Sequence, residues 1–188
     1  NGGPVKVGVA VTDIFTGLYA ANAIQGALLD RHSSGLGQYI DLALLDVQAA
    51  VLANQATNYL VGDMVPQRLG NAHPNIVPYQ AFPTADSHII ITIGNDQQFA
   101  RFCQVLGKPE LANNPSYATN SARVTNRAVL CNKISACLKS ETSTYWLRCL
   151  EENNIPCGPI NSIDQVFENP QIVARDILIE MTDSQGTK

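Results

Sequence analysis

The first third of the chain changes from an alternating to a helical hydrophobic pattern. Valines occupy every second position from Val5 to Val11, which predicts a short strand or an extended lead-in. After a turn at residues 13–17, apolar side chains recur near helical spacing over residues 18–31, which predicts a helix. This helix is rich in alanine. Because small side chains let a helix approach its neighbours closely, we expect it to be buried against other elements.

The next stretch combines a turn, a short strand and a long helix. Gly35 indicates the turn, and residues 38–42 predict the strand. Residues 43–61 are predicted to form one helix that ends at Gly62, because glycine is favoured just after a helix C-terminus. Several polar side chains along this helix argue against a lipid setting.

The composition changes after Gly62. Residues 62–78 hold three prolines and little periodicity, which favours a linker or an active-site loop. The remaining pattern predicts a β-hairpin, three helices, an extended segment and two short elements near the end. In order, these are strands 79–82 and 88–93 with a turn at 83–87, a helix opened by Asn95 and stopped by Gly107, helices opened by Asn120 or Ser121 and by Thr142, an extended segment at 155–160, a short helix from Ser162 or Asp164, and a strand at 177–181.

Four parts follow from this pattern. Residues 1–62 form a mostly helical segment with an apolar lead-in, and residues 63–78 form the linker with its loop. Residues 79–160 form a small α+β domain, and residues 161–188 form a closing linker. No internal repeat or low-complexity tract interrupts this order.

Composition and charge narrow the class of protein. Of the 188 residues, 45% are hydrophobic and 15% are charged, which excludes a disordered chain. The net charge of −4 gives no basic footprint for a nucleic acid, and no apolar run is long enough to predict a membrane span. The five cysteines are odd in number and form no C-x-x-C motif, which is typical of reduced intracellular thiols. The chain starts at Asn1 without a signal-peptide pattern, so its ends are compatible with a fragment or a processed product.

Asp13 is the strongest candidate for chemistry. It follows the apolar lead-in and precedes the predicted helix, whose start we place at Thr16 and Gly17. A carboxylate there is favoured by the helix dipole, and the free N–H groups of the helix start could also stabilise an oxyanion on an acyl carbon. Carboxylates can act as covalent nucleophiles towards acyl donors. The alternative is that Asp13 only caps the helix, because aspartate is among the most common caps.

A second candidate is the loop in the linker. It consists of Gly70, Asn71, Ala72, His73 and Pro74. Glycine and asparagine tolerate unusual backbone angles and proline stiffens the exit, so the loop suits a mobile lid over a site. The alternative is an ordinary interdomain linker.

Other candidates are weaker. Asp96 follows Asn95 at a predicted helix start, where capping is the default interpretation. Cys157 lies in a rigid Pro/Gly frame without an identifiable base, so we interpret it as structural. The three histidines are scattered, no motif of a phosphate loop, dinucleotide fold or serine hydrolase occurs, and no metal site is expected.

Several blocks of the sequence, in one order, resemble the family III CoA-transferases, the CaiB/BaiF family. The resemblance spans essentially the whole chain. The blocks are VGVAVTDIFTGLYAA at residues 7–21, ALL at 27–29, SGLGQYID at 34–41, GNAHP at 70–74, PYQAF at 78–82, GNDQQF at 94–99 and IPCGPIN at 155–161.

The resemblance implies a fold and a mechanism. The fold would be α/β, with a helical segment of a large domain followed by a small α+β domain. Asp13 matches the family's nucleophilic aspartate, which passes through an aspartyl anhydride and an aspartyl-CoA thioester. Gly17 would lie at the oxyanion-binding helix start. The loop from Gly70 to Pro74 matches the glycine-rich loop over the active site, although Asn71, Ala72 and His73 replace glycines found in other members.

The resemblance also suggests substrates. Coenzyme A would be a substrate, with no permanently bound cofactor. The donor would be an acyl-CoA and the acceptor a small carboxylic acid, and the nearest likeness is to the succinyl-CoA:glutarate type, which acts on small dicarboxylates. The same scaffold hosts α-methylacyl-CoA racemases. In a racemase, Asp13 would be an acid/base group, and Asp96 would be a possible second one, because racemases also have a carboxylate near that position.

The chain departs from the family in extent, because family members are about twice as long. The resemblance implies an interlocked homodimer, which is the family's assembly. We also expect a cytoplasmic location, or the mitochondrial matrix if the source is a eukaryote. With half of the enzyme absent, we expect the isolated chain to have little or no transferase activity. A non-catalytic, truncated dimerisation module is the alternative from another class of function.

Overall fold

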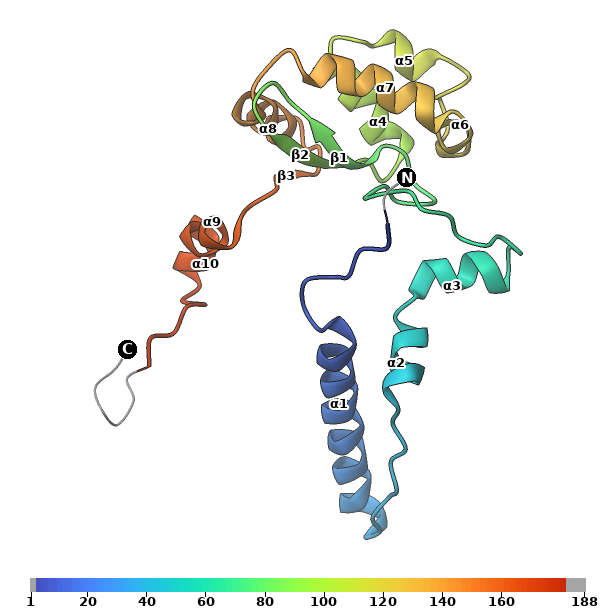
Figure 1. Ribbon diagram of the computed structural model, residues 1–188, viewed down its shortest axis with the longest axis vertical. Coiled ribbons are helices and arrows are strands. Elements are labelled where there is room, and N and C mark those ends of the chain that lie inside the picture. The colour runs from blue at the N-terminus through green and yellow to red at the C-terminus, as the bar shows by residue number, and fades with distance from the viewer. Residues whose placement is uncertain (1–2, 182–188) are drawn as a thin grey trace. The chain divides into compact units, whose positions relative to one another are not determined.

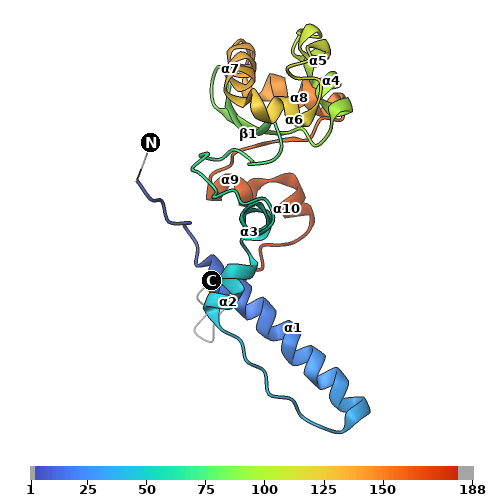
Figure 2. The same cartoon turned by 90° about the vertical axis from the view of Figure 1, so that its right-hand side faces the viewer.

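The computed structural model describes residues 3–181 and divides the chain into two compact units, Asn1–Arg68 and Leu69–Lys188. Figures 1 and 2 show the elements of both units. The division falls inside the stretch 63–78 that the sequence marks by its change of composition.

The first unit begins with an extended segment and a long helix. Helix α1 spans Val11–Ser34 and ends at Gly35, whose φ of 70° lets its N–H bond the Arg31 carbonyl at 2.9 Å. The helix therefore starts before the predicted position at residue 18, and it includes Asp13. Of the two alternatives predicted for residues 5–11, a strand or an extended lead-in, the strand is wrong, since residues 3–10 are irregular and Val11 begins α1. Alternating valines favour an extended backbone, but a strand also needs a partner to complete its hydrogen bonds.

The stretch predicted as one long helix is two helices. Helix α2 spans Leu44–Ala50 and helix α3 spans Ala53–Leu60. The break coincides with Ala53, whose φ of 48° is incompatible with a regular helical path. Gly62 follows α3 as predicted, and a Cβ there would lie 2.8 Å from the Asn58 carbonyl oxygen. The strand predicted over 38–42 is also wrong, because this stretch is irregular.

The first unit buries very little of its apolar surface. Helices α1 and α2 run side by side (Figure 1), yet α1 has no buried residue and α2 buries Val47. The expectation that the alanine-rich helix is buried is wrong for the described part of the chain. Many large apolar side chains of the first unit are exposed, among them Ile14, Leu18, Ile24, Leu28, Leu29, Leu36, Tyr39, Leu45, Leu60 and Val65.

The second unit contains a three-stranded antiparallel sheet in the order β1-β2-β3. Strands β1 and β2 span Tyr79–Pro83 and His88–Thr92, and β3 spans Cys157–Pro159. The predicted hairpin is confirmed, with Ala81 opposite Ile90. Ile89 and Ile91 are fully buried while Ile90 between them is exposed, so one face of the sheet meets the core.

Five helices accompany the sheet, and α7 and α8 contact its strands (Figure 1). The predicted caps Asn95 and Thr142 each accept a hydrogen bond from the N–H of the third residue after them. The helix predicted from residue 120 is two helices, with Thr119 as cap and a break at Asn126. Their bounds are α4 Asp96–Val105, α5 Glu110–Asn113, α6 Asn120–Thr125, α7 Arg127–Leu138 and α8 Ser143–Glu152.

The core of this unit is continuous and aromatic. Its fully buried members come from the sheet and from helices α4, α7 and α8, and include Phe82, Ile89, Ile91, Phe99, Phe102, Leu130, Ile134, Leu138 and Leu150. Trp146 adds a hydrogen bond of 2.8 Å from its indole Nε1 to the Leu138 carbonyl. This bond satisfies the polar atom of a buried ring.

The end of the described chain holds two short helices in contact with each other. Helix α9 spans Ile163–Glu168 and begins, as predicted, after Ser162, which forms a capping box with Gln165. Helix α10 spans Pro170–Ala174 and is missed by the sequence pattern, although Pro170 suits a first helical position. The strand predicted over 177–181 is wrong, since these residues are irregular. In the described residues, no helix has the length and apolarity needed to cross a membrane.

Candidate functional site

Asp13 lies in the first turn of α1, with its side chain exposed. The N-cap of α1 is Ala10, so Asp13 does not occupy the cap position itself. In the first turn, its negative charge still interacts favourably with the helix dipole and with N–H groups that lack helical partners. The Asp13 carboxylate therefore lies beside these N–H groups and remains open to a reagent.

Gly17 does not lie where the sequence reasoning placed it. Since α1 begins at Val11, Gly17 lies inside the helix, beyond the first four positions whose N–H groups lack helical acceptors. The expectation of an oxyanion-binding helix start at Gly17 is therefore wrong. The N–H groups that the helix start leaves available are those around Thr12 and Asp13.

Two threonines make side-chain hydrogen bonds at the start of α1. Thr16 was expected at the helix start, but neither contact was predicted from the sequence. The Thr16 hydroxyl donates to the Thr12 carbonyl at 2.7 Å, one turn back along the helix. The Thr12 hydroxyl donates to the Gln48 side-chain oxygen on α2. This contact ties the turn that carries Asp13 to the neighbouring helix.

The Gly70–Pro74 loop, in the second unit, is hydrogen-bonded to the outer edge of β1. Gly70 has a φ of 63°, in the left-handed region that favours glycine. The Asn71 side-chain oxygen accepts from the Ala81 N–H at 2.9 Å. The His73 N–H donates to the Tyr79 carbonyl at 2.9 Å, and the two rings stack with centroids 5.0 Å apart. These contacts fix the loop's course and occupy backbone groups of an edge strand.

Asp96 lies in the first turn of α4 and is bound to a buried arginine. Its Oδ1 accepts from Arg123 Nη2 at 2.8 Å, while 55% of the Asp96 side chain and 0% of the Arg123 side chain are exposed. The same guanidinium lies over the Phe99 ring, 4.4 Å from its centroid. Because a buried cation needs an anionic partner, Asp96 has a structural role here. The N-cap of α4 is Asn95, so the capping interpretation of Asp96 is wrong.

Three cysteines are poor nucleophiles, of which Cys103 and Cys131 are buried and Cys157 is half-buried. Burial raises the pKa of Cys103 to about 12 and the pKa of Cys157 to about 11. Burial also raises the pKa of Cys131. These thiols are therefore neutral near pH 7, and the thiolate is the reactive form. The interpretation of Cys157 as structural agrees with this chemistry.

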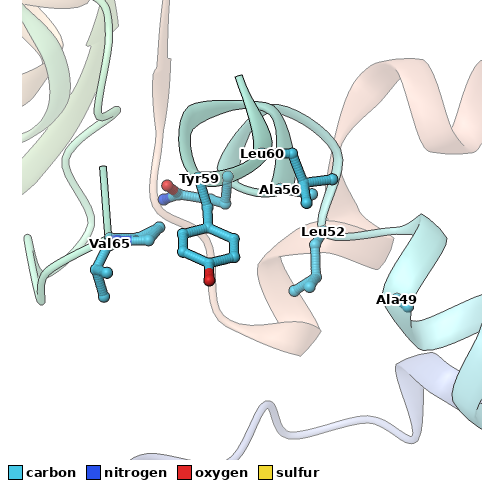
Figure 3. Close-up of a pocket in the computed structure, with 8 residues that line it drawn as sticks. Ala49, Leu52, Ala56, Tyr59, Leu60 and Val65 are labelled. Atoms are coloured by element: carbon cyan, nitrogen blue, oxygen red, sulfur yellow. The ribbon is translucent and has the colours of Figure 1, made fainter. Parts of the chain in front are cut away.

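The first unit also has an apolar hollow of about 750 Å³, shown in Figure 3. It is lined by side chains of α2, α3 and the segment after α3, namely Ala49, Leu52, Gln55, Ala56, Tyr59, Leu60, Val65 and Pro66. Asp13 is not among its lining residues. In the part of the chain that the structure describes, no cluster of three metal-ligating side chains occurs.

Comparison with known proteins assigns the family. The model of CoA-transferase family III matches residues 1–188, so the chain belongs to that family. It is 49% identical over 187 residues to the succinate–glutarate CoA-transferase of Agrobacterium fabrum, covering 100% of this chain and 47% of that protein. It is 45% identical over 181 residues to the human succinyl-CoA:glutarate CoA-transferase, covering 96% of this chain and 41% of that protein.

Solved structures agree with this assignment. A CaiB/BaiF family protein from Brucella suis superimposes with a TM-score of 0.73 and 48% identity, covering 98% of this chain and 48% of that one. A protein from Mycobacterium tuberculosis superimposes with a TM-score of 0.83 and 26% identity, over 96% and 46% of the two chains. The resemblance and the mixed helix-and-sheet fold expected from it are confirmed. The chain spans about half the length of the relatives that it matches.

Proposed function

We propose that the intact polypeptide carrying this chain is an acyl-CoA:carboxylate CoA-transferase with Asp13 as its covalent nucleophile. The Asp13 carboxylate attacks the donor thioester carbonyl and expels CoA thiolate, which leaves a mixed anhydride. The thiolate then attacks the Asp13 carbonyl of the anhydride, releases the donor acid and forms an aspartyl-CoA thioester. One difficult acyl exchange becomes a series of exchanges between activated acyl groups.

The second half of the cycle reverses these steps with the acceptor. The acceptor carboxylate attacks the Asp13 thioester and again expels CoA thiolate. The thiolate attacks the acceptor's acyl carbon in the new anhydride, which forms acceptor acyl-CoA and returns Asp13 as a carboxylate. Coenzyme A is thus a substrate, and the cycle is balanced without a further cofactor.

One observation carries the proposal: Asp13 is an exposed carboxylate in the first turn of a long helix, in a chain of CoA-transferase family III. The free N–H groups of that turn favour negative charge near Asp13. They also suit the oxyanion that forms whenever an acyl carbon on Asp13 is attacked.

We propose a small dicarboxylate as the acceptor, with succinyl-CoA and glutarate as the first pair to assay. The support is the names of the Agrobacterium and human relatives, which both combine succinate and glutarate. Other relatives act on oxalate or mesaconate, so the assay needs these acids as competitors. We propose the Gly70–Pro74 loop as part of the site that discriminates among them.

The isolated chain is expected to have little activity, and the assembled enzyme is proposed to be a homodimer. The low activity is supported by the chain's length, which is about half that of the relatives that it matches. The homodimer is supported by the exposed apolar surface of α1. A non-catalytic dimerisation module is the alternative for the isolated chain, and it predicts a stable dimer that does not bind CoA. A racemase would instead exchange the α-proton of a 2-methylacyl-CoA in deuterated water.

The test is an isotope transfer to Asp13 in the intact polypeptide. With glutarate labelled by oxygen-18 in its carboxylates, the bridging oxygen of the second anhydride stays on Asp13, so the Asp13 peptide gains one heavy oxygen. Hydroxylamine trapping with succinyl-CoA should modify the same peptide. Asp13→Asn should abolish both signals, whereas Asp46→Asn, an exposed first-turn aspartate of α2, should not. Transfer that continues at an undiminished rate in Asp13→Asn would refute the mechanism.

A further inference from the structure

The segment that leaves the Gly70–Pro74 loop is held by side chains from the start of α6 and α7. Arg127 Nη2 donates to the Pro74 carbonyl at 2.7 Å. Asn120 Nδ2 donates to the Asn75 carbonyl at 2.8 Å, and Asn120 Oδ1 accepts from the Val77 N–H at 3.1 Å. Each bond joins a side chain to a backbone group more than forty positions away in the sequence.

Arg123 completes this set from the core side. Its Nε donates to the Val77 carbonyl at 2.7 Å, and its Nη1 donates to the Tyr117 carbonyl at 3.0 Å. Asn120 and Arg123 lie three positions apart on α6, and Arg127 is the first residue of α7; the side chains of all three bond the segment 74–77. We call these three side chains the loop clamp.

The loop therefore lies between two anchors. On one side, Asn71 and His73 are bonded to β1. On the other side, the loop clamp fixes the carbonyls of Pro74 and Asn75. A loop held at both ends can present its remaining groups in one geometry, and preorganised geometry is what acyl transfer between bound reactants requires.

Arg127 differs from an ordinary stabilising residue. Its Nη1 is buried and, within the described residues, has no hydrogen-bond partner. A buried donor without a partner costs free energy, so an apolar side chain would serve stability better at this place. The charge-assisted bond from Nη2 to the Pro74 carbonyl is the contact that an apolar side chain could not provide.

We propose that Asn120 and Arg127 are positioning residues, which hold the Gly70–Pro74 loop in the geometry that acyl transfer needs. They act through the loop and are not themselves catalytic residues. Arg123 serves both the clamp and the core, because its buried guanidinium also binds Asp96. The inference rests on the proposed function of the loop.

The first test measures hydrogen exchange of the loop in the intact polypeptide. Arg127→Met should speed exchange in peptides covering residues 69–77 by roughly tenfold, because one charge-assisted bond is lost from a local structure. Peptides from α8 should keep their wild-type exchange. Arg127→Lys keeps a single donor and should restore most of the protection. Arg101→Met, the same substitution at an exposed position of α4, should change nothing.

The second test separates positioning from folding. In Arg127→Met, kcat for succinyl-CoA and glutarate should fall by about tenfold or more, since a small misplacement of reacting groups slows the reaction strongly. The KM for the donor should stay near the wild-type value, and Arg127→Lys should recover activity. Asn120→Asp, which keeps the acceptor for Val77 and loses the donor to Asn75, should give a smaller fall in kcat.

The possible results distinguish the inference from the function on which it rests. Unchanged loop exchange in Arg127→Met, or faster exchange throughout the second unit, would overturn the positioning role. A loosened loop with wild-type kcat would do the same while leaving the transferase proposal intact. A wild-type polypeptide that transfers no CoA would refute the proposed function, whatever the exchange measurements give.

Discussion

The two units of this chain bury their apolar surface very differently. In the second unit, two strands and three helices supply fully buried apolar side chains, among them Phe99 and Phe102. In the first unit, a helix of 24 residues has no buried side chain, although its sequence contains many leucines, isoleucines and alanines. Since helices in proteins owe most of their stability to packing of an apolar face, the first unit needs a further surface to be stable. The candidate nucleophile, Asp13, thus lies on the unit whose stability depends more on contacts with a further surface.

The largest expected effect is on independent folding. A polypeptide of residues 69–181 should fold cooperatively, because it contains the complete sheet and the core cluster. A polypeptide of residues 3–68 should show no cooperative transition, because it lacks a core of its own. Circular dichroism during thermal unfolding and the dispersion of amide signals in NMR spectra would measure both. A cooperative transition in 3–68 as a monomer would contradict the comparison.

A pair of helical substitutions tests the same contrast at single residues. Phe102→Ala removes a fully buried ring from α4 and should cost about 3–5 kcal/mol of unfolding free energy. Leu29→Ala on α1, at a side chain that is 72% exposed, should change the stability of the 188-residue chain by less than about 0.5 kcal/mol. Denaturant unfolding measures both values.

The same pair becomes more informative in any longer polypeptide that contains this chain. If another surface covers α1 there, Leu29→Ala should become costly while the effect of Phe102→Ala stays the same. An unchanged, small effect of Leu29→Ala in both settings would show that α1 remains exposed at this position.

Local signals in the sequence were sufficient for the hairpin and for several helix starts of the second unit. The hairpin has one strand with aromatic residues, Tyr79–Pro83, and one β-branched strand, His88–Thr92, around a polar turn. Asn95, Thr142 and Ser162 are capping residues whose side chains bind N–H groups close to them in the chain. Such interactions need no distant partner, so the sequence pattern is enough to predict them. The three strands predicted elsewhere failed, because a strand is completed only by a partner that alternation does not specify.

The candidate site was predictable only in part. Asp13 stood out through its position and through the family resemblance, but the early start of α1 moved Gly17 into the helix. Arg123 and Arg127 gave no local signal, because their partners at Val77 and Pro74 are far away in the sequence. A single arginine in a predicted helix is normally solvated. Its burial becomes visible only when the chain has folded around it.

The smallest expected effect concerns pH and Asp86, in the turn of the hairpin. A hydrogen bond from the Ser143 backbone N–H, at 2.7 Å, is the main cause that lowers the pKa of Asp86 below its ordinary value of 3.8. The Thr84 hydroxyl also donates to it. Because the folded-state pKa is depressed, this contact stabilises the fold above the unfolded-state pKa, and the contribution is lost as pH falls through the folded-state pKa.

Asp86→Asn should therefore lower the melting temperature of a 69–181 polypeptide slightly at neutral pH and reduce its loss of stability below about pH 4. The difference between wild type and variant should shrink as pH falls, since protonated Asp86 accepts the Ser143 N–H less well. Asp30→Asn on α1 is the control when both variants are measured in the whole chain, because the Asp30 carboxylate accepts from the side chains of Ser34 and Gln38 near the end of that helix. If Asp86→Asn left the acid limb of the stability curve unchanged, the hairpin turn and α8 would not be coupled through this carboxylate. The closed core of the second unit would then account for its stability without help from the turn.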